Sequence, residues 1–107
     1  MWTTAALHRI DTETEVKSGI LNLTDCDLTG IPEKILNMSW LQELSLKSNQ
    51  ISAIKNLDAL PSLQYLDLDR NQIVEIKNLD ALARLKTLFL SRNQIIEING
   101  GHNIKHG

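Results

Sequence analysis

Aromatic residues are scarce in this chain of 107 residues, because phenylalanine, tryptophan and tyrosine together make up only 4% of it. Hydrophobic residues nevertheless make up 42%. The core is therefore predicted to be aliphatic, built mainly from leucine and isoleucine. A basic stripe and stacking aromatics are the usual features of a nucleic-acid surface. The sequence has neither, and we expect no nucleic-acid partner.

Cysteine pairs, a large net charge and long apolar runs are also lacking. Cys26 is the only cysteine, so no internal disulfide can form, and a reducing, cytoplasmic location is expected. The formal net charge is −2, from 11 Lys and Arg against 13 Asp and Glu. No segment approaches the ~20 apolar residues of a membrane span, and the N-terminal stretch has no signal-peptide pattern. We expect no membrane partner.

What the sequence does contain is a repeat with a period of 22 residues. The segment IKNLDAL occurs unchanged at 54–60 and at 76–82. The tripeptide NQI recurs at the same offset, at 49–51, 71–73 and 93–95. Three segments share the opening L-x-x-L-x-L-x-x-N-x-I, namely 41–62, 63–84 and 85–98. A fixed period of 20 to 29 residues with this pattern is the signature of leucine-rich repeats.

The chain thus resembles the leucine-rich repeat family, in the short subclass of phosphatase regulators, internalins and Roco-type sensor domains. The resemblance covers residues 18–98, with a first, less regular repeat at 18–40. It implies a non-enzymatic module that binds a protein partner. The alternative is the sensor segment of a larger multidomain enzyme such as a Roco GTPase, although the chain contains no GTPase motif.

The apolar spacing changes character inside each repeat. Leu44 and Leu46 alternate with polar residues, as expected of a half-buried strand. Ile51, Ile54 and Leu57 then follow at steps of three, which favours a tight 3₁₀-like or irregular arc. Stacked units of this kind share one core. We predict an α/β solenoid, a right-handed superhelix with about four parallel strands on its concave side.

Asparagine recurs where each predicted strand bends into its arc. These positions are predicted to form a structural ladder that satisfies backbone groups, and they are Cys26, Asn49, Asn71 and Asn93. Cysteine replaces asparagine at the first of them, as the repeat pattern allows. Asn56 and Asn78 lie in the repeated IKNLDAL and are expected to cap their own short turns. Trp40 matches surface positions of the later repeats and is expected to be a large exposed aromatic.

The two ends of the chain depart from the repeat. Residues 1–17 are predicted to form a short amphipathic helical cap, begun by Thr3 or Thr4, with Ala6, Leu7 and Ile10 on its buried face. A solenoid needs such a cap to cover its first unit. At the other end, the tail 99–107 leaves the last repeat unfinished. Truncation of a longer array is the favoured explanation, with self-association through an uncapped edge as the alternative.

The sequence contains two residue pairs whose spacing resembles a metal or catalytic site. His102 and His106 are four residues apart, a spacing that suits a metal on a helix, but they lie in a glycine-flanked tail. Asp67 and Asp69 lie on one side of a predicted strand and are interpreted as solvated residues. No nucleophile, base and orienting group occur together. We expect no enzyme activity, no cofactor and no metal.

The predicted strand alternation identifies a candidate binding patch. Tyr65 and Phe89 are the only tyrosine and the only phenylalanine, and the register places them diagonally on neighbouring strands, within reach of aromatic contact. Tyrosine and arginine are enriched at binding hot spots. The predicted partner-binding residues are Tyr65, Asp67, Asp69, Arg70, Phe89, Arg92 and Lys47. The alternative is that the two aromatics merely reflect strand propensity.

Overall fold

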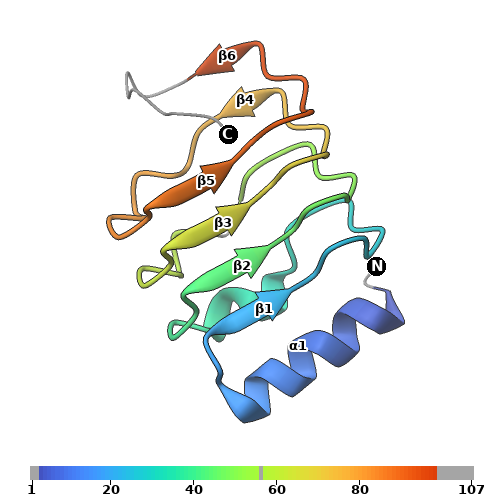
Figure 1. Cartoon of the computed structure of the whole chain (residues 1–107), viewed down its shortest axis with the longest axis vertical. Coiled ribbons are helices and arrows are strands. Elements are labelled where there is room, and N and C mark those ends of the chain that lie inside the picture. Colours follow the sequence, from blue (N-terminus) through green and yellow to red (C-terminus); the bar gives the residue numbers. More distant parts are fainter. Residues whose placement is uncertain (1–2, 56, 99–107) are drawn as a thin grey trace.

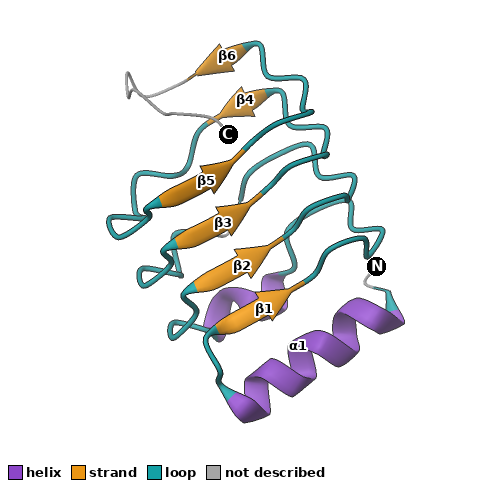
Figure 2. Cartoon of the chain, viewed as in Figure 1, coloured by secondary structure: helices purple, strands orange, loops and turns teal. Residues whose placement is uncertain are grey.

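The computed structural model describes residues 3–55 and 57–98, which form one helix followed by repeated strand-and-arc units (Figure 1). The elements in chain order are α1 (Thr4–Val16), β1 (Ile20–Asn22), the 3₁₀ helix η1 (Glu33–Asn37), β2 (Glu43–Ser45), β3 (Tyr65–Asp67), β4 (Glu75–Ile76), β5 (Thr87–Phe89) and β6 (Glu97–Ile98). Figure 2 shows that long connecting segments separate the short strands.

Four strands form a parallel sheet in the order β1-β2-β3-β5, which confirms the predicted number and direction of strands. Leu21, Leu44, Leu66 and Leu88 lie opposite one another across this sheet and point to the core. Each strand is only three residues long. Parallel pairing is possible because the arc of each repeat returns the chain to the start of the next strand.

The return arcs turn tightly, as the spacing of three predicted. In the first repeat the arc contains η1, and in the later repeats Leu60 and Leu82 each donate a backbone hydrogen bond to the carbonyl three residues earlier. The sequence did not predict a second sheet, in which β4 pairs in parallel with β6 (Figure 1). The three-residue spacing of the apolar side chains indicates only which residues are buried. It does not distinguish a turn from a two-residue strand.

The helix α1 packs against β1 and covers the first repeat (Figure 1). The Thr3 side chain accepts a hydrogen bond from the Ala6 N–H at 3.2 Å, so Thr3 is the N-cap. Ala6 and Ile10 are buried as predicted, whereas Leu7 is only half-buried. The third buried residue of the helix is Glu13. The buried face predicted from the sequence did not include this charged residue.

Candidate functional site

The candidate site lies on the outer face of the four-stranded sheet, and the asparagine ladder holds that face in register. The Asn49 Oδ1 accepts hydrogen bonds from the backbone N–H groups of Cys26 (3.0 Å) and Leu28 (2.9 Å) in the preceding repeat. Its Nδ2 donates to the carbonyls of Leu23 and Leu46. The buried amide therefore connects two adjacent repeats through backbone groups that would otherwise be unsatisfied.

The same bonds recur at the next two ladder positions. Asn71 accepts from the Ile51 N–H at 3.0 Å and donates to the Leu46 carbonyl at 2.9 Å. Asn93 accepts from the Ile73 N–H at 3.0 Å. Cys26 is buried at the first position, where its Sγ lies 3.5 Å from a guanidinium nitrogen of Arg9. A thiol cannot make the set of bonds that the amide makes, and here an arginine from the cap helix approaches it instead.

Asn78 does not cap its own turn, contrary to the sequence-based expectation. Its Nδ2 donates to the carbonyl of Ile54 in the preceding repeat at 2.7 Å, and its backbone is left-handed with a φ of 64°. Asparagine adopts this conformation more readily than most residues. The Asn78 side chain thus makes a further hydrogen bond between repeats. Asn56, for which the same role was expected, lies outside the described residues.

The residue before each ladder position is left-handed as well. Ser48, Arg70 and Arg92 each have a φ of 58°, and Asp25 has a φ of 57°. The repeat therefore requires this conformation at the corner where the strand ends. Arg70 and Arg92 are exposed at these corners, so that their side chains begin at the rim of the sheet.

We call the outer side of the sheet β1-β2-β3-β5 the strand face. Two rows of side chains cross it in the observed register: Ile20, Glu43, Tyr65 and Thr87 in the first, and Asn22, Ser45, Asp67 and Phe89 in the second. This register places Tyr65 and Phe89 diagonally on neighbouring strands, as the sequence predicted. The rings of Tyr65 and Phe89 are in edge-to-face contact, with centroids 5.5 Å apart and an interplanar angle of 62°. Both rings are half-buried.

The two aspartates of the strand face are not the solvated residues that the sequence suggested. Asp67 is only 8% exposed, and its Oδ1 accepts the N–H of Asp69 at 2.9 Å. Asp69 is half-buried, and its Oδ1 accepts the N–H of Ser91, which follows β5, at 2.6 Å. Both carboxylates are therefore held by backbone donors. Asp67 in particular offers little surface to a partner.

These carboxylates affect the neighbouring tyrosine. Burial raises the pKa of the Tyr65 hydroxyl, and the negative charges of Asp67, Glu43 and Asp69 raise it further. The hydroxyl consequently stays protonated and can donate a hydrogen bond to a ligand over the whole physiological pH range. The same charges make the surroundings of Tyr65 electrostatically negative.

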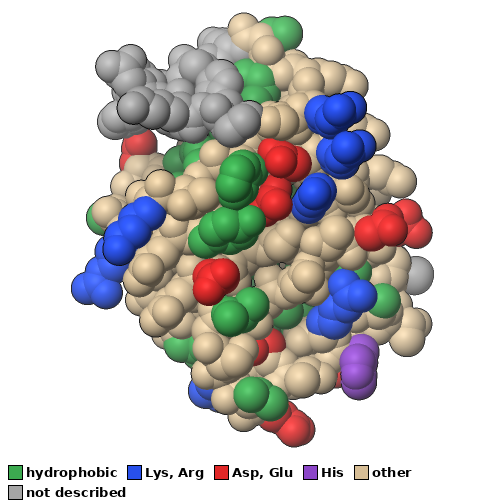
Figure 3. All heavy atoms as spheres, viewed as in Figure 1, with side chains coloured by type: hydrophobic (Ala, Val, Ile, Leu, Met, Phe, Trp, Pro, Cys, Tyr) green, Lys and Arg blue, Asp and Glu red, His purple; other side chains and the backbone are tan. Residues whose placement is uncertain are grey.

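A shallow hollow of about 370 Å³ adjoins the aromatic pair on the strand face. Its lining runs from β1 to β3 and includes Asn22, Glu43, Ser45, Lys47 and Tyr65. In the space-filling view of this side, hydrophobic side chains gather near the middle, with acidic side chains beside them and Lys and Arg side chains further along the surface (Figure 3). The surface suits an apolar side chain with polar neighbours better than a small reactive substrate.

Comparison with known proteins agrees with this architecture. The family model described as "Leucine rich repeat" matches residues 19–73, which is half of the chain, and that of "Leucine Rich repeats (2 copies)" matches residues 61–102. The chain belongs to the leucine-rich repeat family. No curated protein matches it as a relative.

Two solved structures of similar fold are internalins from Listeria monocytogenes. Internalin C2 is 32% identical with a TM-score of 0.65, and the match covers 75% of this chain and 34% of that one. An internalin described as inlF is 23% identical with a TM-score of 0.50, and the match covers 69% of this chain and 32% of that one. This leucine-rich repeat chain thus spans about a third of the length of either internalin. The second likeness shows the fold alone.

A buried carboxylate attaches the cap of this leucine-rich repeat chain to its first repeat. Glu13, only 4% exposed, accepts hydrogen bonds from the Ser18 hydroxyl (2.6 Å), the Gly19 N–H (2.8 Å) and the Trp40 indole N–H (2.8 Å). Burial by itself raises the pKa of the Glu13 carboxyl, but the bonds from Ser18, Trp40 and Gly19 together outweigh it and lower the pKa overall. Glu13 is therefore an anionic anchor, and nothing in the sequence pattern indicated it.

Trp40 is part of this attachment and is not the exposed aromatic that the sequence predicted. It is half-buried against the core, and the ammonium of Lys17 lies 4.6 Å from the centroid of its ring. That geometry is a cation–π contact. The register identified Trp40 correctly as a corner position, but the helix α1 covers this corner only in the first repeat.

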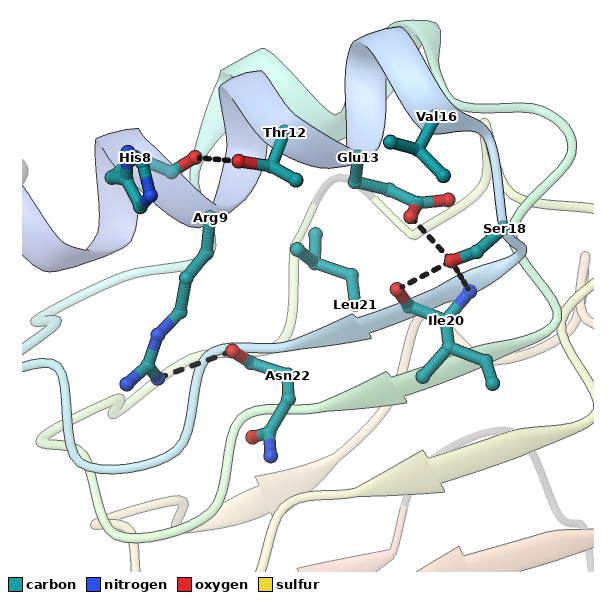
Figure 4. A pocket seen from close by; sticks show the side chains of 9 residues that line it. All are labelled: His8, Arg9, Thr12, Glu13, Val16, Ser18, Ile20, Leu21 and Asn22. Carbon is teal, nitrogen blue, oxygen red and sulfur yellow. Dashed lines mark hydrogen bonds between the residues drawn. The ribbon is translucent and has the colours of Figure 1, made fainter.

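A second hollow, of about 430 Å³, lies between α1 and β1. Figure 4 shows Arg9 reaching from the helix to the carbonyl of Asn22, and the Ser18 hydroxyl meeting the backbone of Ile20. Arg9 also donates to the Thr24 carbonyl at 3.3 Å. Side chains thus form hydrogen bonds with backbone groups on the outer edge of β1. This hollow has no residue in common with the aromatic pair.

The described residues form neither a metal centre nor a membrane-spanning helix. In the described ranges 3–55 and 57–98, no three His, Cys, Asp or Glu side chains gather as they would around a metal ion. Within the same ranges, no helix is long and apolar enough to cross a membrane. His102 and His106, which the sequence analysis considered as metal ligands, lie outside the described residues.

Proposed function

We propose that this leucine-rich repeat chain is a non-enzymatic module that binds a protein partner through its strand face. One observation carries the proposal: the pair Tyr65–Phe89 lies half-buried on the outer side of the sheet, in edge-to-face contact at 5.5 Å. Fixed aromatic rings give a large contact area with little loss of conformational entropy on binding. Membership of the leucine-rich repeat family, whose domains commonly mediate protein–protein interaction, supports a binding role.

The size of the face sets an expectation for affinity. Four strands about 4.8 Å apart and about 10 Å long present only a few hundred Å². A standard interface buries about 800 Å² on each partner. This part of the chain is therefore expected to bind weakly on its own, in the micromolar range or above.

The test compares capture of a partner by the chain and by two variants. The double variant Tyr65→Ala with Phe89→Ala removes both rings, and Glu15→Ala, on the exposed side of α1, is the matched control. A partner that binds the wild type and Glu15→Ala, but binds the double variant at least tenfold more weakly in calorimetry, supports the proposal. Equal affinity for all three folded proteins places the binding site elsewhere.

We also propose self-association through the C-terminal end of the repeats, because apolar side chains are exposed there. Leu85, Leu88 and Ile95 are only partly buried, and Ile96 is 86% exposed. Gel filtration from micromolar to near-millimolar concentration tests whether the chain self-associates. A constant monomer would contradict it. The buried free thiol of Cys26 is compatible with the reducing, cytoplasmic location that we propose for the chain.

A further inference from the structure

Three cations stand at the rim of the strand face, where the strands β2, β3 and β5 end. Lys47 follows β2, Arg70 follows β3 and Arg92 follows β5. Arg70 and Arg92 are exposed, and Lys47 is half-exposed. The salt bridge found among residues 3–55 and 57–98 joins Lys77 to Glu75. In that part of the chain, none of the three rim cations has a carboxylate partner.

The carboxylates near the rim are already held by other groups. Asp67 accepts the backbone N–H of Asp69, and Asp69 accepts that of Ser91. These bonds turn the Asp69 carboxylate toward β5 and not toward Lys47. At the ends of β2, β3 and β5 the rim therefore carries more cations than carboxylates, although Asp25 stands at the equivalent corner after β1.

The two arginines, Arg70 and Arg92, stand at positions where they are not expected to stabilise the fold. Each is left-handed, with a φ of 58°, a conformation that is unfavourable for residues with a long side chain. They stand 22 residues apart, after the ends of neighbouring strands whose backbones are about 5 Å apart, so two like charges begin from adjacent positions. Ser48 occupies the same corner in the preceding repeat, which shows that the fold does not need arginine there. An external anion would make use of both positions.

The charges of the strand face also give it a direction. At the start of the strands, Glu43 lies beside Tyr65 and adds a negative charge. At the ends of β2, β3 and β5, the three rim cations outnumber the acidic side chains Asp67 and Asp69. A charged segment that lies along the strands is therefore favoured in one orientation only.

We propose that the strand face binds an extended acidic segment of a protein, with an apolar side chain on the pair Tyr65–Phe89 and its carboxylates against Lys47, Arg70 and Arg92. This inference rests on the proposed function and names the partner's chemistry. Phe89 is three residues from Arg92, and Tyr65 is five residues from Arg70. At about 3.3 Å per extended residue, the apolar and acidic residues of the segment stand about three to five residues apart.

The experiment selects from a random 12-residue peptide display library on immobilised chain at low salt. Wild-type protein is expected to enrich peptides that carry an apolar residue with Asp or Glu three to five residues away. The double variant Arg70→Glu with Arg92→Glu is expected to enrich Lys or Arg at that place instead. In fluorescence anisotropy, the neutral variant Arg70→Asn with Arg92→Asn should bind a selected peptide about tenfold more weakly. Asparagine tolerates the left-handed corner, so this variant should fold.

Matched controls separate this inference from the proposed function. Lys34 and Lys55 are exposed cations of the return arcs, and their double change to Glu should leave the selected peptides bound. Peptides that require Tyr65 and Phe89, but bind equally to the Arg70→Glu/Arg92→Glu variant, would overturn the acidic partner and leave the binding face intact. Peptides indifferent to both double variants, or no enrichment at all, would overturn both proposals.

Discussion

The two ends of the described repeat stack differ in what covers their core and their strand edge. At the N-terminal end, α1 covers the core, Leu21 is only 3% exposed, and Arg9 and Ser18 occupy backbone groups on the outer edge of β1. At the other end, the equivalent leucine, Leu88, is half-exposed, and β5 pairs only with β3 in the described part of the chain. One helix therefore supplies both an apolar cover and polar side chains for the strand edge, which are the two things that a terminal repeat lacks.

The largest expected effect comes from truncating the leucines of one row across the sheet. Leu66→Ala should lower the free energy of unfolding by about 2 to 5 kcal/mol, because the residue is fully buried. Leu21→Ala should lose nearly as much, since the cap buries it. Leu88→Ala should lose about 1 kcal/mol, because part of its surface already meets water. Urea denaturation of the three variants checks the order.

Equal losses for Leu21→Ala and Leu88→Ala would show that the cap does not distinguish the two ends energetically. Lys77→Ala, on an exposed side chain with one surface salt bridge, is the neutral control.

The Glu13 anchor should have the next largest effect. Glu13→Ala leaves three donors without their acceptor and should lower the free energy of unfolding by about 2 to 3 kcal/mol. Glu15→Ala, on the exposed side of the same helix, is the control and should change it little. Tryptophan fluorescence should shift as well, because the Trp40 indole loses its partner. A melt indistinguishable from that of Glu15→Ala would contradict the anchor.

The same carboxylate predicts a pH dependence. Its pKa is lower in the folded chain than its ordinary value of 4.5. The stabilisation is therefore complete above the pKa of the unfolded chain and is lost as the pH falls through the pKa of the folded chain. Thermal melts of wild type and Glu13→Gln between pH 7 and pH 2 should converge at the acidic end. Curves that stay parallel throughout would rule out this contribution.

The ladder should show the same contrast between interior and end, on a smaller scale. Asn71 is buried and bonds to backbone groups of the preceding repeat and of its own, so Asn71→Ala should cost about 2 kcal/mol. Asn93 makes equivalent bonds but is half-exposed, so water can replace them and Asn93→Ala should cost about 1 kcal/mol. Asn71→Leu should also destabilise the chain, despite its added apolar bulk. A thermal melt series measures all three.

The smallest effect on stability is expected at the strand edge. Arg9→Ala with Ser18→Ala should change the free energy of unfolding by less than about 1 kcal/mol, because the freed carbonyls of Asn22 and Thr24 become accessible to water. It should, however, make the edge of β1 available for pairing. Sedimentation should then show association that is absent in Arg84→Ala, an exposed arginine of a return arc. A double variant that stays as monomeric as this control would mean that the helix itself protects the edge.

The comparison of the ends also explains which residue positions could be predicted from the sequence. Leu44, Leu66, the ladder asparagines and the pair Tyr65–Phe89 follow from the 22-residue period, because each repeat packs on a copy of itself. Asp67 shows the limit of this reasoning. Strand alternation put it on the outer face, but its burial depends on how its carboxylate folds back onto the N–H of Asp69.

The sequence by itself determined the repeat, the direction of the strands, the rows of the strand face and the presence of a helical cap. Only the tertiary structure decided that Glu13 is buried, that Trp40 is covered and that Arg9 meets the edge of β1. The physical reason is that a period records contacts between like units. Contacts between the cap and the first repeat join unlike segments, up to 27 residues apart for Glu13 and Trp40, and such contacts leave no periodic trace in the chain.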